Sequence, residues 1–257
     1  MLFRSQVKRQ ATNKPAAPGS AGKPRAVVDH AAANPKREIF KVLARIGAAL
    51  ASPVRLELLE VLGQAERSVE QLARLTGASM ANTSQHLQKL KHAGLIVARK
   101  EGLFVRHRVA GPEVTALFVA LAKAGEFHLA DVERLVRLYF TAKDELEPVG
   151  AAELLERSRA GLVTVLDVRP AEEYAAGHVP GAVNIPLSQL AKRLGELPSR
   201  KDIVAYCRGP YCLLSFDAVA LLRARGRNAH RLIDGLPEWR LGGWPVEVLV
   251  EDARTSG

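Results

Sequence analysis

The chain has 257 residues, of which 47% are hydrophobic and 25% are charged, enough apolar material for two ordinary globular domains. No apolar run reaches the roughly 18 residues that a membrane span needs, and no apolar segment of the signal-peptide kind follows the basic start. Two cysteines exclude a secreted disulfide framework. We therefore expect a cytoplasmic protein that does not enter a membrane, with an organelle transit peptide as the alternative reading of the first residues.

Positive charge is concentrated in the first half of the chain. Residues 1–111 carry 19 Lys and Arg against 7 Asp and Glu, whereas residues 151–257 carry 14 against 13. A basic region of this kind favours a polyanionic partner, because Lys and Arg neutralise phosphate groups. The asymmetry indicates a first half that binds nucleic acid and a second half with another task.

The first half begins with residues 1–36, which are rich in Ala, Pro, Lys and Arg and lack periodic apolar residues, as is typical of a disordered basic tail. A helical pattern starts at Arg37. Start and stop signals predict three more helices, at Ser52-Pro53 with Gly63, at Ser68 and Gln71 with Gly77, and at Ser79 with Gly94. Two strand patterns, 95–100 and 103–110, flank the turn signal Glu101-Gly102, and a long helical stretch spans roughly 112–146.

Short helices followed by a strand hairpin give the element order of a winged helix-turn-helix. The segment "SMANTSQHLQKLKHAG" has an apolar set that predicts docking on the domain: Met80, Leu87, Leu90 and Ala93. Its polar and basic residues are candidates for contacts with base edges and phosphates: Ser79, Asn82, Thr83, Ser84, Gln85 and Lys89. The hairpin adds Arg99, Lys100, Arg106 and Arg108. A solvated polar helix face is the alternative, and the basic hairpin and the charge asymmetry disfavour it.

These motifs resemble the ArsR family of bacterial winged-helix repressors over about residues 37–145. The similarity lies in "SPVRLELL", in "SQHLQKL" and in the basic wing with its Glu-Gly turn. The resemblance implies a homodimer formed by the first and last helices of the domain, a palindromic double-stranded DNA operator and repression that a ligand relieves. Metal-sensing members have a cysteine motif where this chain has Ser68-Val69-Glu70, and His128 stands alone near Asp131 and Glu133. We therefore expect no metal in this domain.

The second half alternates short buried-strand patterns with helical ones. Strands are predicted at 162–168, at 202–207, in "AHRLID" and near "WPVEVLV", and helices at 171–177, 187–195 and 213–225. This alternation is typical of an α/β domain with a parallel sheet.

Both cysteines lie in "AYCRGPYCLLS", where an apolar strand leads to Cys207 and a helical pattern follows Cys212. The turn between them is a candidate active-site loop, with the residues Arg208, Gly209, Pro210 and Tyr211. Converging backbone N–H groups and a helix N-terminus favour the thiolate form of Cys207, which is the nucleophile that takes up sulfane sulfur. An inert buried cysteine is the alternative.

The surroundings of this loop resemble the rhodanese domain over about residues 148–249. The similarity is carried by "LDVRPAEEYAAGHVPGAVNIP" and by "DGLPEWRLGGWPV". The resemblance implies that Cys207 carries sulfur, with no cofactor, and that Asp167 lies close enough to support the loop. Phosphatases of related fold place Arg six positions after the cysteine to clamp phosphate. Leu213 stands there, which disfavours that chemistry. Cys212 either attacks a persulfide on Cys207 or only packs on the helix.

We thus predict a multidomain protein: a basic tail (1–36), a mainly α winged helix-turn-helix domain for DNA binding and dimerisation (37–147) and an α/β rhodanese-like domain with a parallel central sheet (148–257). The functional prediction is a DNA-binding repressor in which sulfane sulfur from polysulfide or thiosulfate, taken up on Cys207, modulates operator binding. Two alternatives stay open. One is a sulfurtransferase whose winged helix serves dimerisation or DNA localisation, and the other is a repressor whose rhodanese domain is only a scaffold.

Overall fold

The computed structural model describes residues 34–140 and 148–249. The predicted basic tail lies almost entirely outside these residues, although Pro35 already begins the first helix. The predicted boundary between residues 147 and 148 coincides with the end of a segment, 141–147, that also lies outside them. The extents of the tail and of the two domains therefore stay predictions.

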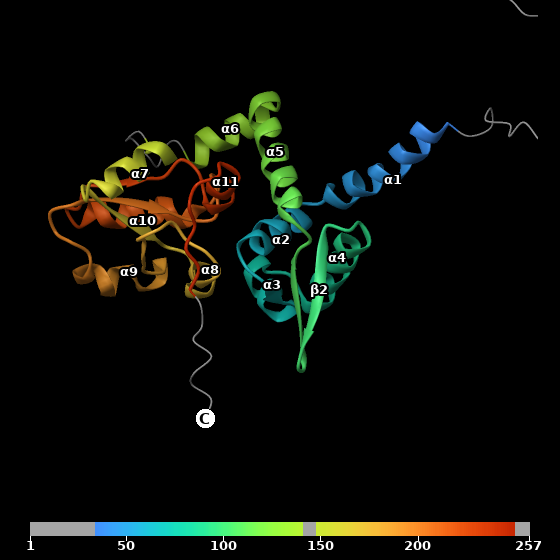
Figure 1. Cartoon of the computed structure of the whole chain (residues 1–257), viewed down its shortest axis with the longest axis horizontal. Helices are drawn as coiled ribbons and strands as arrows, with labels where there is room; N and C mark the ends of the chain where they lie inside the picture. Colours follow the sequence, from blue (N-terminus) through green and yellow to red (C-terminus); the bar gives the residue numbers. More distant parts are fainter. Residues whose placement is uncertain (1–33, 141–147, 250–257) are drawn as a thin grey trace, which may run out of the picture. The chain divides into compact units, whose positions relative to one another are not determined.

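The first domain has the predicted order of helices and hairpin (Figure 1). Its elements are α1 (Pro35–Leu50), α2 (Pro53–Gln64), β1 (Arg67–Ser68), α3 (Val69–Thr76), α4 (Met80–His92), β2 (Ile96–Glu101), β3 (Phe104–Val109), α5 (Pro112–His128) and α6 (Ala130–Tyr139). The three strands form an antiparallel sheet in the order β1-β3-β2. Gly102 closes the hairpin with φ of 60°, in the left-handed region that glycine adopts without a steric cost. The winged helix-turn-helix prediction is confirmed.

Two element boundaries differ from the prediction. The helix predicted to stop at Gly63 continues through Gln64, and the long helix over 112–146 is broken at Leu129. Leu129 has extended backbone angles (φ −112°, ψ 104°), and the acidic residues Asp131 and Glu133 fill the first turn of α6. Carboxylates are favourable at a helix N-terminus, so the sequence after Leu129 stabilises a new helix rather than a continuation.

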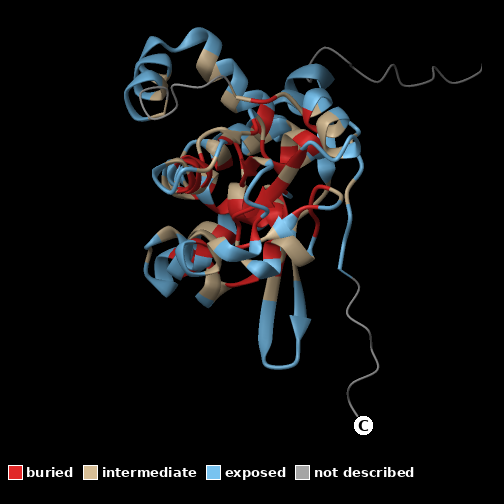
Figure 2. Ribbon diagram, turned by 90° about the vertical axis from the view of Figure 1, so that its left-hand side faces the viewer, coloured by how far each residue is buried: buried red, intermediate tan, exposed pale blue. Residues whose placement is uncertain are grey.

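Apolar residues of α2, α3, α4 and β2 form the core of this domain: Leu58, Leu62, Leu72, Leu87, Leu90 and Ile96. Met80 was predicted to join them, but it is 47% exposed. It is the first residue of α4, and the residues of α4 that are buried in the domain begin at Thr83. Figure 2 shows the buried interior in red and a long exposed hairpin. The residues of β2 after Ile96 and those of β3 other than the buried His107 are at least partly exposed and remain available for contacts outside the domain.

The start of α3 is the predicted capping box. The Ser68 hydroxyl accepts a hydrogen bond from the Gln71 backbone N–H, and the Gln71 side chain accepts one from the Ser68 backbone N–H. Gly77 ends the helix with φ of 65°. Both signals that the sequence offered for this helix are thus confirmed, and they set the entry to the helix-turn-helix.

We expect Ser68→Ala to lower the free energy of unfolding of the winged helix by about 0.5–2 kcal/mol, because the Gln71 backbone N–H loses the hydroxyl that accepts its hydrogen bond. Ser52→Ala is the matched control, since Ser52 occupies the N-cap position of α2 without a side-chain hydrogen bond to it. Denaturant titrations monitored by circular dichroism measure both. Equal losses from the two substitutions would contradict the assignment of the capping box.

The second domain contains a parallel four-stranded sheet in the order β5-β4-β6-β7. Its elements are α7 (Ala151–Arg159), β4 (Val163–Asp167), α8 (Ala171–Ala175), β5 (Val183–Asn184), α9 (Leu187–Arg193), η2 (Leu194–Glu196), β6 (Asp202–Tyr206), α10 (Leu213–Ala224), β7 (Ala229–Arg231) and α11 (Leu236–Leu241). The α/β prediction is confirmed. The strand predicted near "WPVEVLV" is wrong: the described part of that segment makes only an isolated bridge, between His178 and Glu247.

Alternating residues of the strands pack against helices on opposite faces of this sheet. Ile203 and Ala205 of β6 share one core with Leu190 of α9 and with Leu222 of α10. On the other face, strand residues share a second core with helices α7 and α11, whose contributions are Leu154, Leu236 and Trp239. Cys207 and Cys212 belong to the first core, so the sheet delivers both thiols to one side of the domain.

Candidate functional sites

The candidate sulfur site is the six-residue turn between β6 and α10. Cys207 directly follows the carboxyl end of β6, and Cys212 is the N-cap residue of α10. The Cys212 backbone N–H donates to the Gly209 carbonyl oxygen at 3.1 Å, which folds the loop back on itself. The side chains of both cysteines are shielded, since Cys207 is 2% exposed and Cys212 8%. The predicted strand, cysteine, loop and helix follow one another as expected.

The two thiols differ in their affinity for a proton. Burial raises the pKa of Cys207, but hydrogen bonds from Cys212, from Ser215 and from the backbone of Gly209 outweigh it, so this pKa lies below its ordinary value. The Ser215 hydroxyl oxygen lies 3.2 Å from Cys207 Sγ and accepts a hydrogen bond from the thiol; when Cys207 is deprotonated, the same hydroxyl can donate to the sulfur. Hydrogen bonding to Cys207, together with burial, raises the pKa of Cys212. Of the two cysteines, Cys207 therefore loses its proton more readily than Cys212.

The sequence reasoning missed Ser215, although it lies in the first turn of the helix predicted from residue 213. The Cys212 carbonyl oxygen lies 3.3 Å from Cys207 Sγ. The Cys207 thiol therefore has two hydrogen-bond acceptors within reach, this carbonyl oxygen and the Ser215 hydroxyl oxygen. Because the Ser215 hydroxyl can either accept or donate, it follows the protonation state of Cys207. Its position is a consequence of helix geometry, and the helix prediction itself was the signal that would have located it.

We expect Ser215→Ala to move the pH profile of Cys207 alkylation to higher pH, because the thiolate loses a hydrogen-bond donor and its pKa rises. At neutral pH the alkylation rate falls as a result. The measurement is iodoacetamide labelling across pH with mass spectrometry of peptide 205–215. Ser188→Ala, at an exposed position of α9, is the control. A Ser215→Ala profile that matches the wild type would show that this hydroxyl does not stabilise the thiolate.

Arg208, the residue after Cys207, is held by a buried carboxylate. Its Nη2 donates to Glu173 Oε1 at 2.7 Å, and its Nε lies 3.1 Å and 3.2 Å from the two carboxylate oxygens. The Glu173 side chain, on α8, is fully buried, and it also accepts from Arg67 Nη2 of β1 at 3.2 Å. A buried carboxylate needs such partners, and here two guanidinium groups supply them.

Asp167 was predicted to support the loop, and the structure gives it no direct bond to residues 208–212 among the described contacts. Its carboxylate accepts from Arg169 at 2.6 Å and from the Tyr206 hydroxyl at 2.6 Å. Arg169 Nη1 in turn donates to Gln64 Oε1, whose amide nitrogen donates to the Arg208 carbonyl oxygen. Asp167 therefore reaches the loop indirectly, through Arg169 and Gln64 and through Tyr206, which precedes Cys207, and its role stays a prediction.

The predicted DNA-facing residues of α4 lie on its exposed side, with one exception. Those exposed are Ser79, Asn82, Ser84, Gln85 and Lys89. Ser79 is the N-cap, and its hydroxyl accepts from the Asn82 backbone N–H. Thr83 is fully buried, because it lies on the same side of α4 as Leu87 and Leu90, so it cannot contact a base edge. We remove Thr83 from the predicted DNA contacts.

Some of the basic residues of the wing form ion pairs with acidic neighbours. Arg99 pairs with Glu66 at 2.9 Å, and Arg106 pairs with Glu101 at 2.7 Å. Lys100 and Arg108 are exposed, and Arg108 lies 3.5 Å from Glu66. Exposed pairs of this kind contribute little stability and are screened by salt, so they can be exchanged for phosphate contacts. DNA contacts by the wing stay a prediction.

Within residues 34–140 and 148–249, no group of three or more His, Cys, Asp or Glu side chains is arranged to hold a metal ion. His128 is the last residue of α5, where it is exposed. The expectation that the domain senses no metal is untested by this observation and stays a prediction. None of the helices in the described ranges is long and apolar enough to cross a membrane.

The fold and the loop together define a class of protein, a winged helix-turn-helix joined to a rhodanese domain that has a cysteine at the end of strand β6. A helix-turn-helix domain model matches residues 50–99, and a rhodanese-like domain model matches residues 150–241. The HTH-type transcriptional regulator Rv0324 of Mycobacterium tuberculosis is 47% identical over 216 residues, which are 82% of this chain and 93% of that protein. The chain belongs to this family of HTH-type transcriptional regulators with a rhodanese domain.

Partial relatives match each half. The sulfurtransferase of Allochromatium vinosum is 32% identical over 85 residues, 33% of this chain and 78% of that protein. The solved structure of the homodimeric winged helix-turn-helix DNA-binding domain Mb0332 from Mycobacterium bovis is 37% identical, covers 44% of this chain and 95% of that chain, and aligns with a TM-score of 0.36. The predicted combination of a winged helix with a rhodanese domain is confirmed, and the protein is a transcriptional regulator.

Proposed function

We propose that this regulator senses sulfane sulfur, and that Cys207 is the acceptor whose loading changes the affinity for operator DNA. The observation that supports this proposal is the hydrogen-bonded, shielded Cys207, whose pKa is lowered while that of Cys212 is raised. The thiolate attacks the terminal sulfane sulfur of a polysulfide, a new S–S bond forms, and the shortened polysulfide leaves with the electron pair of the bond that breaks. The product is a Cys207 persulfide. Thiosulfate as donor would release sulfite in the same way.

We propose a second step for Cys212. Its carbonyl oxygen is 3.3 Å from Cys207 Sγ, and its interaction with Cys207, together with burial, raises the pKa of its thiol, which favours the protonated form while Cys207 reacts. Once deprotonated, it would attack the inner sulfur of the persulfide, forming a Cys207–Cys212 disulfide and releasing hydrosulfide. Packing alone remains the alternative. A disulfide and a persulfide differ in mass, so the same peptide analysis separates them.

We also propose a homodimer in the cytoplasm that binds a palindromic operator. Large apolar residues of α1 are more than half exposed, namely Ile39, Phe40, Val42 and Leu43. Apolar residues of α5 and α6 are exposed as well, among them Leu121, Phe127 and Leu138. A monomer rarely leaves so much apolar helix surface in water, and the homodimeric state of the M. bovis domain supports the same arrangement here.

The test is an operator-binding titration with and without polysulfide, with mass spectrometry of peptide 205–215 from the same samples. We expect one added sulfur on Cys207, a shift of operator affinity of about 5–150-fold, and no shift in Cys207→Ser. DNA binding itself should weaken steeply with salt, because phosphate contacts release counterions. A Cys207→Ser protein that still responds to polysulfide would refute sulfur sensing at this residue.

A sulfurtransferase is the second candidate function, favoured by the similarity to the A. vinosum sulfurtransferase. Its signature would be sustained turnover of thiosulfate with a thiophilic acceptor such as cyanide. Steady turnover combined with an operator affinity that ignores sulfur would favour the enzyme. A single loading event that changes operator affinity favours the regulator.

A further inference from the structure

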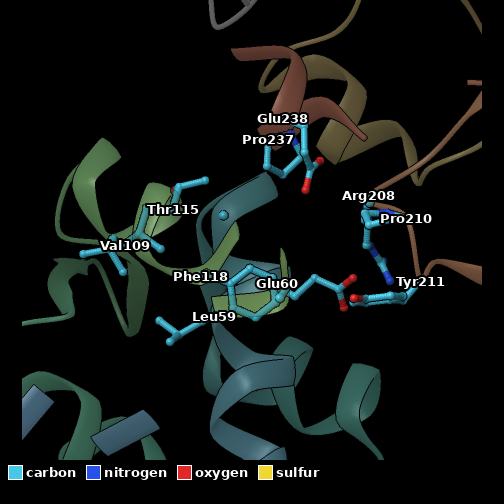
Figure 3. A pocket seen from close by; sticks show the side chains of 14 residues that line it. Leu59, Glu60, Val109, Thr115, Phe118, Arg208, Pro210, Tyr211, Pro237 and Glu238 are labelled. Atoms are coloured by element: carbon cyan, nitrogen blue, oxygen red, sulfur yellow. The ribbon is translucent and has the colours of Figure 1, made fainter. Parts of the chain in front are cut away.

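The outer face of the sulfur-accepting loop is not open to solvent, because the winged helix contacts it. Gln64, the last residue of α2, is 2% exposed, and its Nε2 donates to the Arg208 carbonyl oxygen at 3.1 Å. In Figure 3 the side chain of Glu60, also from α2, points toward those of Arg208 and Tyr211. The rim of the sulfur site is therefore built from both domains.

A second contact reaches the loop through a buried charge. Glu173 joins Arg208 of the loop to Arg67 of β1, and the exposures of the three side chains are 0%, 15% and 5%. Ion pairs that are this shielded are strongly interdependent, since removing one partner leaves a buried charge without full compensation. The position of Arg208, next to the nucleophile, is thus linked to the position of Arg67.

Loading must disturb this arrangement. Cys207 is only 2% exposed, so an added sulfur atom on Sγ meets a closed wall, and packed interiors have few voids of that size. Gly235 supports the loop from behind: a Cβ added there would lie 2.4 Å from backbone atoms of Arg208 and Gly209. The loop therefore has no room to move in that direction. Movement in other directions displaces the Arg208 carbonyl from Gln64.

From these contacts, and resting on the proposed function, we propose that Gln64 and Arg67 of the winged helix are positioning residues of the sulfur site that hold it closed. The donor reaches Cys207 when the contacts to Arg208 and Glu173 open, and the persulfide keeps them open. The DNA-binding domain thereby controls access of the sulfur donor to Cys207. The loss of the Gln64 and Arg67 contacts in turn transmits the loading of Cys207 to the DNA-binding domain.

The ion pair between Arg67 and Glu173 is connected to the wing and to α3 through strand β1. Arg67 and Ser68 form β1, which pairs with His107 and Arg106 of the wing strand β3. Ser68 also caps α3, and Gln71 of that cap accepts from Arg106. Release of Arg67 therefore acts on the wing and on the first helix of the helix-turn-helix at once. Coupling between the sulfur site and the DNA-binding domain requires an element with two arrangements. In this proposal the element is β1, with Arg67 either bound to Glu173 or released from it.

The experiment measures iodoacetamide labelling of Cys207 in the unloaded full-length chain, with tandem mass spectrometry to separate Cys207 from Cys212. Arg67→Met and Gln64→Met remove the contacts at nearly constant volume. We expect Cys207 to react at least about fivefold faster in both, the lower end of typical coupling. Arg157→Met is the matched control, because Arg157 forms its ion pairs with Glu153 and Asp202 inside the rhodanese domain. Wild-type rates in both Arg67→Met and Gln64→Met would overturn the proposal.

A second measurement needs no variant and covers the case of a substitution that unfolds the chain. Hydrogen exchange of the wild type, before and after polysulfide treatment, should show faster exchange in residues 64–68 of the loaded protein. Unchanged protection there, in a sample with the persulfide confirmed by mass, would also overturn the proposal. Neither readout involves DNA. If sulfur does not change the operator affinity, the proposed function is refuted. The labelling rates and the hydrogen exchange of residues 64–68 would still test whether Gln64 and Arg67 hold the sulfur site closed.

Discussion

Gly235→Ala should slow sulfur uptake on Cys207 strongly without a change at either cysteine. The added Cβ would lie 2.4 Å from the Arg208 carbonyl carbon and oxygen and from the Gly209 nitrogen, far inside van der Waals contact with backbone. The loop then moves away from α11, and the hydrogen bonds that stabilise the thiolate are lost. We expect persulfide formation to slow at least about tenfold and stability to fall by about 1–3 kcal/mol.

Persulfide formation is followed by mass spectrometry of peptide 205–215 after polysulfide treatment, and stability by denaturant titration. Gly195→Ala is the matched control, since nothing lies within 4 Å of its added Cβ. If Gly235→Ala loads sulfur at the wild-type rate, the close approach of α11 to the loop is not a requirement of the site.

Asp167→Ala should destabilise the rhodanese domain by about 3–5 kcal/mol, because it leaves the fully buried Arg169 without its carboxylate. Among the described residues, the hydrogen-bond acceptors left to the Arg169 guanidinium would be the Gln64 side chain and the Gly177 carbonyl. Tyr206 also loses the acceptor of its hydroxyl, 2.6 Å away. Burial and the Asp167 carboxylate raise the pKa of Tyr206, so its phenol stays protonated and donates across the physiological pH range.

Glu196→Ala provides the comparison for this loss, since Glu196 pairs with Arg193 at the surface and its side chain is half exposed. Its midpoint of unfolding should stay at the wild-type value, because solvent screens such a pair. An Asp167→Ala midpoint that also stays unchanged would show that Arg169 finds other compensation. The domain core would then not depend on this carboxylate.

Local signals in the sequence predicted most of the fold. Ser68 with Gln71, Gly77 and Gly102 act within a few residues of chain, and each of them sets a cap or a turn as expected. The alternation of strand and helix patterns likewise predicted the parallel sheet. Where such local signals were weak, as at Leu129 and at the two-residue strand β1, the predicted elements were wrong or missing.

The sequence by itself determined the two domains, the basic asymmetry and the loop with Cys207 and Cys212, because these depend on composition and on neighbours along the chain. Only the tertiary structure decided that Thr83 is buried and that Ser215 faces the sulfur of Cys207. It alone brought Gln64 and Arg67 to the loop, across 144 residues for Gln64 and Arg208 and 106 residues for Arg67 and Glu173. Contacts between residues this far apart follow from how the two cores pack, and no local pattern encodes them.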